Sequence, residues 1–144
     1  MVTATGILIL IIGLVAWLGQ TLAFLTPRFA VKLGVLERKE GIDASLYVIE
    51  AKAEGLVDML LTWTFPLSAL LMLLDHPFWP YLGLTGSGMF LYIGGLIPFS
   101  RVFLKREGKK VGSRSAERAA YVFGAMWALS AVAMIALATV ELSI

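Results

Sequence analysis

Four long apolar segments dominate this chain of 144 residues and limit the folds open to it. They run over about residues 5–26, 44–74, 79–104 and 116–141. Each supplies the roughly 20 apolar residues that a helix needs to cross a hydrocarbon core. Because a bilayer offers no water to exposed backbone groups, such segments cross it as helices. We therefore predict an all-α integral membrane protein, a single domain built as a four-transmembrane-helix bundle.

The composition supports a lipid environment. Hydrophobic residues make up 59% of the chain and charged residues 15%, with a mean hydropathy of +0.86. A soluble domain has roughly 45–50% apolar residues even with glycine counted. With no Cys and one His, the chain offers no Cys-ligated or multi-histidine metal site, so no metal site is expected. No motif identifies a cofactor or a nucleic-acid partner, and the expected partner is the bilayer.

The basic residues fix the predicted orientation. All 12 Lys and Arg residues lie in or beside two regions, the connection between the first and second segments and the connection between the third and fourth; Lys52, Arg101 and Arg118 lie in the ends of the adjoining segments. The N-terminus, the turn at 75–80 and the C-terminus contain none. Positively charged loops stay in the cytoplasm. We expect a multi-pass protein of the plasma (inner) membrane with both termini outside and the first segment retained. The same loops would also suit an anionic lipid surface or a partner.

Short polar residues mark two helix starts. Asp43 or Ser45 is expected to cap the second helix, and Ser113 or Ser115 the fourth, because a short side-chain oxygen accepts from the free amides of a first turn. Pro66 lies inside the second segment, where a missing N–H usually kinks a helix.

The two halves of the chain share a pattern that suggests two similar helical hairpins. Pro27-Arg28 is followed by Lys32, and Pro98 and Arg101 are followed by Lys105. A parallel repeat would explain this. The alternative is that Pro and basic residues are common at helix exits.

Small residues predict where the later helices pack. Ala120, Gly124 and Ala128 recur every four residues on the fourth helix, and Gly88 and Gly95 share a face of the third. Small residues let helix backbones approach closely, within a chain or between chains.

Three acids form the most informative pattern. Glu50, Glu54 and Asp58 recur every four residues, so a helix places them on one face, and Thr62 continues that face. An ionised carboxylate inside a membrane needs a cation, a proton or the bundle interior. Asp58 is expected to lie deepest.

The candidate site is built around these acids. We expect a ligand- or cation-binding site formed by Glu50, Glu54, Asp58, Thr62, Trp63 and Tyr92. Arg28, Arg101 and Lys105 are the candidate contacts for anionic groups. Counter-charges for the acids are available in Lys52, Arg28, Arg101 and Arg118. The alternative is a purely structural role, in which these residues form interfacial ion pairs that fix helix packing.

Three functions remain open at this point. The acids would form a cytoplasm-facing intramembrane site that binds or conducts a cation, a proton or a small amphipathic ligand, in a chain that forms a homo-oligomer. Alternatively, the chain is a non-catalytic accessory subunit of a larger membrane complex. As a third alternative, it is a membrane enzyme that acts on a lipidic substrate by carboxylate acid/base or metal-assisted chemistry.

Overall fold

The computed structural model describes residues 2–143, and its regular elements in that range are helices. They are α1 (Val2–Leu25), α2 (Pro27–Lys32), the 3₁₀-helix η1 (Lys39–Gly41), α3 (Ala44–Val48), the π-helix η2 (Ile49–Glu54), α4 (Gly55–Leu61), α5 (Thr64–Leu73), α6 (Trp79–Arg106) and α7 (Arg114–Leu142). Within the described range, four helical segments are long and apolar enough to cross a membrane: Thr3–Leu25, Ala44–Leu73, Trp79–Arg106 and Arg114–Leu142. The predicted all-α four-helix bundle is confirmed.

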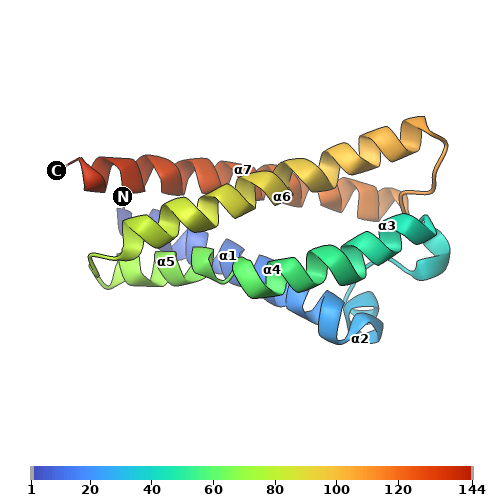
Figure 1. Cartoon of the computed structure of the whole chain (residues 1–144), viewed down its shortest axis with the longest axis horizontal. Coiled ribbons are helices and arrows are strands. Elements are labelled where there is room, and N and C mark those ends of the chain that lie inside the picture. The colour runs from blue at the N-terminus through green and yellow to red at the C-terminus, as the bar shows by residue number, and fades with distance from the viewer. Residues whose placement is uncertain (1, 144) are drawn as a thin grey trace.

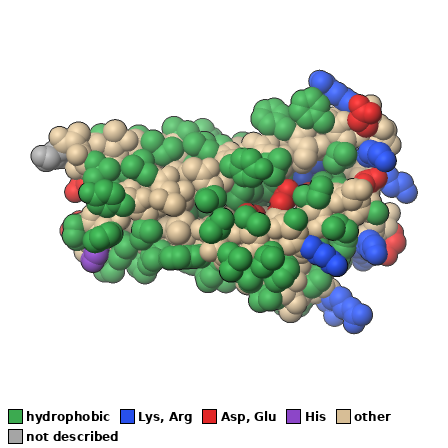
Figure 2. All heavy atoms as spheres, in the orientation of Figure 1, with side chains coloured by type: hydrophobic (Ala, Val, Ile, Leu, Met, Phe, Trp, Pro, Cys, Tyr) green, Lys and Arg blue, Asp and Glu red, His purple; other side chains and the backbone are tan. Residues whose placement is uncertain are grey.

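The bundle is elongated and has two distinct ends (Figure 1). The turn between α5 and α6 lies at one end, together with the start of α1 and the end of α7; we call it the turn end. The segments 26–43 and 107–113 lie at the other end, which we call the basic end. Apolar side chains cover much of the face seen in Figure 2, and the Lys and Arg side chains visible there gather at the basic end.

The half of the bundle near the turn end is tightly packed. Phe65 and Phe90 are stacked with ring centroids 4.1 Å apart, and both are almost fully buried. Gly86 lets α6 approach α5, because a Cβ there would lie 2.7 Å from the Phe65 backbone. Met134 on α7 belongs to the same buried cluster. This core joins the first hairpin (α1 with α3–α5) to the second hairpin (α6 with α7) on the side of the turn end.

The helices α6 and α7 pack closely through a pair of glycines. A Cβ on Gly124 would lie 2.8 Å from the Gly94 carbonyl oxygen, and a Cβ on Gly94 would lie 2.8 Å from the Gly124 carbonyl oxygen. Gly124 therefore lies at the helix contact. The helix contact predicted through Gly88 and Gly95 does not occur within the chain. A Cβ on Gly88 would meet nothing within 4 Å, because the buried face of α6 passes through Gly94.

The second span is a chain of four helical pieces. The α-helical hydrogen bonding changes to π-helical over Ile49–Glu54 and is interrupted at Thr62 and Trp63. The interruption has a local cause, because Pro66 has no N–H to donate to the Thr62 carbonyl. That carbonyl accepts from the Phe65 amide at 3.2 Å, and the Thr62 hydroxyl donates to the Asp58 carbonyl at 2.7 Å.

The two loops of the basic end are fastened to each other. Ile42 and Val111 form an isolated antiparallel bridge, and the Asp43 amide donates to the Lys110 carbonyl at 2.8 Å. Of the predicted caps, Asp43 accepts from the Ser45 amide and Ser113 accepts from the Ala116 amide. The helix α1 ends at Leu25, and Pro27 begins the separate helix α2. Pro98, in contrast, lies inside α6. The shared Pro–Arg–Lys pattern thus occurs in two different local structures.

Candidate functional site

A cavity of about 600 Å³ lies between the two hairpins on the side of the basic end. Its walls come from α1 and η2 on one side and from α6 and α7 on the other, and residues 33–38 close it toward the basic end. Neither α4 nor η2 packs closely along α6 or α7, so the hairpins separate there. Figure 2 shows acidic side chains in the hollow between α6 and the segment α3–α4. The polar side chains that line the cavity are Gln20, Glu37, Arg38, Glu50, Glu54, Arg101, Ser113 and Ser115.

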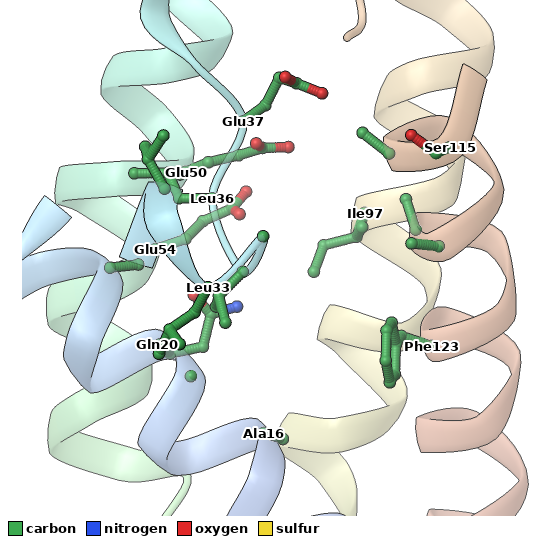
Figure 3. A pocket seen from close by; sticks show the side chains of 18 of the residues that line it. Ala16, Gln20, Leu33, Leu36, Glu37, Glu50, Glu54, Ile97, Ser115 and Phe123 are labelled. Atoms are coloured by element: carbon green, nitrogen blue, oxygen red, sulfur yellow. The ribbon is translucent and has the colours of Figure 1, made fainter. Parts of the chain in front are cut away.

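Two of the three predicted acids share this cavity. The carboxylates of Glu50 and Glu54 point from η2 toward α6 and α7 (Figure 3). Both belong to the π-helical turn, whose i→i+5 hydrogen bonds widen the helix. Such turns are rare and frequently occur at functional sites. Here the widened turn carries both acids on the face that lines the cavity.

Glu50 is neutralised by an arginine from the other hairpin. Its Oε1 lies 2.6 Å from Nη2 of Arg101, and both side chains are mostly buried. The guanidinium also donates from Nη1 to the carbonyl of Ile97, at 3.2 Å. Of the four candidate counter-charges, the structure therefore pairs Arg101 with the acidic face. The charge of Glu50 is balanced within the chain.

Glu54 has no such partner. Across the part of the chain that the structure describes, no Lys, Arg or His nitrogen lies within ion-pair distance of its carboxylate. Glu54 is half-buried and lines the cavity directly below Glu50. A carboxylate at this depth is costly unless a cation or a proton compensates it. Of the three acids that line the cavity, Glu54 is therefore the one with neither an ion pair nor a side-chain hydrogen bond among the described residues, because Arg101 pairs with Glu50 and Ser113 donates to Glu37.

Asp58 lies deeper and outside the main cavity. Its side chain is buried, with 4% of the residue exposed, and it lines a second, small void of about 10 Å³. Ala16, Gln20 and Trp127 line both this void and the main cavity. Thr62 also lines the void, so the predicted face from Asp58 to Thr62 points inward.

Glu37 closes the cavity toward the basic end. Its Oε2 accepts hydrogen bonds from the amide of Ser113 at 3.1 Å and from the hydroxyl of Ser113 at 2.9 Å. Partial burial acts to raise the pKa of this carboxyl, but the hydrogen bonds from Ser113 and Arg38 outweigh it and hold the pKa below its usual 4.5. Glu37 therefore fastens the loop 33–38 to the start of α7 as a carboxylate.

Four of the predicted site residues lie elsewhere. Trp63 and Tyr92 are exposed on the outside of the bundle, and Tyr92 is 67% exposed. Arg28 is exposed on α2. Lys105 pairs with Glu117 at 2.8 Å, next to a hydrogen bond from the Tyr121 hydroxyl to Glu117. None of the four lines the cavity.

Several cavity residues were not among those predicted for the site. Glu37 lies in a loop that has no periodic pattern, so nothing in the sequence connects it with the acids on the second span. Gln20, whose amide points into the cavity in Figure 3, is the one strongly polar residue inside the first apolar segment. A single strongly polar residue within an apolar run is expected to face the bundle interior, and this feature of the sequence could have identified Gln20 as a cavity residue.

The fold and the cavity define a multi-pass membrane protein with a polar, acid-lined chamber between two helical hairpins. No protein-family model, no curated protein and no solved structure matches this chain.

Proposed function

We propose that this protein binds a small amphipathic cation in the cavity between its hairpins. The observation that carries the proposal is Glu54, a half-buried acid that lines the cavity and has no cationic partner in residues 2–143. Glu50 does not compete for the ligand's charge, because Arg101 lies 2.6 Å from it. A ligand with one positive charge would restore the balance that the described chain lacks.

The size and walls of the cavity favour an organic cation over a bare ion. A volume of about 600 Å³ falls within the roughly 300–1,000 Å³ that is usual for small-molecule sites. No three acidic or histidine side chains in the described chain come together as a metal site. Phe123 and Trp127 line the cavity and offer aromatic faces, which attract cations. Val15, Leu36 and Ile97 would contact the apolar part of the ligand.

In our proposal the basic end lies in the cytoplasm and both termini lie outside, in the inner membrane. The support is the placement of all 12 Lys and Arg residues around the two loops of the basic end. The cavity would then lie in the inner half of the bilayer. The ligand would enter sideways, through the hollow between α6 and the segment α3–α4 (Figure 2).

A pair of probes of similar shape and opposite charge tests the proposal. The purified protein in nanodiscs of zwitterionic lipid would be titrated with tetraphenylphosphonium and with tetraphenylborate, and protein-free nanodiscs would give the partitioning background. We expect saturable binding of the cation only. Glu54→Gln should weaken that binding by about tenfold or more, because tenfold corresponds to only about 1.4 kcal/mol.

Glu107→Gln is the matched control. It removes the same charge from an exposed position after α6, outside the cavity, and should leave the affinity for the phosphonium unchanged. Equal binding of cation and anion, or equal affinity in the wild type and Glu54→Gln, would overturn the proposal.

A further inference from the structure

The wall of the main cavity carries a second polar side chain without a partner. Gln20 on α1 lines the cavity, and its amide points into the open space in Figure 3. The Gln20 side chain is half-buried and makes no hydrogen bond with any other residue in the range 2–143. A polar residue inside a membrane-spanning segment is costly and typically marks a functional site. Gln20 is therefore a candidate ligand contact.

Gln20 and Glu54 come from backbones that lie side by side. Gly55 directly follows Glu54, and a Cβ on Gly55 would lie 3.4 Å from the Gln20 carbonyl oxygen and 3.1 Å from Cβ of Phe24. The missing side chain at Gly55 thus lets α1 approach the second span next to Glu54. Both polar side chains line the same cavity, and Figure 3 shows them pointing into it from these neighbouring helices.

The chemistry of these two side chains favours a ligand with N–H donors. A carboxylate only accepts hydrogen bonds, and a glutamine amide accepts through its oxygen. A half-turn about the last side-chain bond exchanges the amide oxygen and nitrogen, so the oxygen of Gln20 can face the cavity. A primary ammonium group has several N–H donors and can donate to both side chains at once. A quaternary ammonium group has none.

We propose that Gln20 and Glu54 together bind the head group of a protonated organic amine, and that Gln20 makes the cavity selective for amines that keep N–H donors. This inference rests on the proposed function, because it names the class of organic cation that the cavity binds. Glu54 would balance the charge of the ammonium group, and the Gln20 oxygen would accept a further N–H.

Hydration alone gives the opposite preference. A primary ammonium gives up hydrogen bonds to water when it enters the cavity, whereas a quaternary ammonium has no N–H to lose. In an apolar cavity without acceptors, the quaternary form would therefore bind more tightly. A preference for the primary amine reports directly on hydrogen-bond acceptors in the wall.

Two cations with the same apolar tail test this selectivity. The protein in nanodiscs of zwitterionic lipid would be titrated at neutral pH with phenylbutylammonium and with phenylbutyltrimethylammonium. Calorimetry would give both dissociation constants after subtraction of the signal from protein-free nanodiscs. We expect the primary amine to bind about tenfold more tightly to the wild type, which corresponds to about 1.4 kcal/mol.

Gln20→Met separates hydrogen bonding from the size of the head group. Methionine has a similar length and lacks the amide, and an apolar residue suits this segment. The preference for the primary amine should largely disappear in this variant, whereas a steric preference would remain. Thr21→Val is the matched control and should keep the wild-type preference, because the Thr21 hydroxyl donates to the Trp17 carbonyl at 2.7 Å and does not line the cavity.

The outcomes distinguish this inference from the proposed function. If tetraphenylphosphonium binds in a Glu54-dependent manner but the wild type has equal affinity for the two amines, this inference is overturned and the proposed function stands. A preference that is unchanged in Gln20→Met would overturn it as well. If neither tetraphenylphosphonium nor the amines bind, both proposals are overturned.

Discussion

The guanidinium of Arg101 lies 2.6 Å from the carboxylate of Glu50, and this ion pair between two cavity-lining residues joins α6 to η2. The two elements make few other contacts, so the pair bridges a gap that side-chain packing does not close. In our proposal the two neighbouring acids therefore have different roles: Glu50 joins the hairpins through Arg101, and Glu54 binds the charge of the ligand.

Removing one partner of this pair should destabilise the protein strongly. Arg101→Met leaves Glu50 mostly buried and unpaired, which typically costs about 3–5 kcal/mol. Replacing both partners, as Arg101→Met with Glu50→Leu, should recover most of that loss, because a well-packed apolar pair avoids the desolvation penalty. Unfolding in mixed detergent micelles would measure both free energies. If the free energy of unfolding of Arg101→Met equalled that of the wild type, the pair would not stabilise the fold.

The contact between α6 and α7 should not tolerate a larger residue at Gly124. A Cβ at this position would lie 2.8 Å from the Gly94 carbonyl oxygen and 3.0 Å from Cδ of Pro98. Gly124→Leu should therefore reduce stability by about 1–3 kcal/mol or more through overpacking. Val122→Leu is the control, since Val122 is 54% exposed on the outer surface. Thermal melts in detergent should separate the two variants, and equal melting temperatures would contradict the close contact.

The link between Glu37 and Ser113 should depend on pH. Its hydrogen bonds lower the pKa of Glu37 below 4.5, so their contribution is fully present above that pH and is lost as the pH falls through the lowered value. Glu37→Gln should reduce stability at neutral pH by about 1 kcal/mol. The difference in melting temperature between the wild type and this variant should shrink well below pH 4.5. If the difference in melting temperature stays constant as the pH falls, the Glu37 carboxylate is not the source of the extra stability.

The proposed orientation can be tested with reporters. A reporter that is active only in the cytoplasm should be silent when fused to the C-terminal end of the chain, and a periplasm-active reporter at the same place should be active. Fusion in the loop 107–113 should give the opposite pattern, because that loop carries Lys109 and Lys110 at the basic end. Cytoplasmic activity of the C-terminal fusion would overturn the orientation.

The helical spans were predictable because a bilayer accepts few backbone structures. Apolar length alone indicates where such helices run, and short polar residues such as Asp43 and Ser113 mark where two of them begin. The π-helical turn over Ile49–Glu54 was not predictable, since residues four apart share a face in an ordinary α-helix as well. The break at Thr62 was foreshadowed by Pro66, four residues later.

Only some of the residues that line the cavity could be predicted from the sequence. Periodicity brought Glu50 and Glu54 together, but the choice of Arg101 among four basic residues depends on how the hairpins pack. Helix geometry does argue against Tyr92: it is nine residues from Arg101 (101 − 92), or two and a half turns, and so lies on the opposite face. The aromatic side chains on the cavity wall are instead Phe123 and Trp127, which come from the other helix of that hairpin.

The fastening of the basic end has a consequence for the order of assembly. Glu37 and Ser113 are 76 positions apart in the chain, so their hydrogen bonds join the connection inside one hairpin to the connection inside the other. Each hairpin can enter the bilayer as a separate unit and pack against its neighbour afterwards. The chamber comes into being only at that second stage, when a loop made early in synthesis meets one made late. A nascent chain stalled before α7 would carry Glu50, Glu54 and Asp58 without the wall of the chamber that α7 provides.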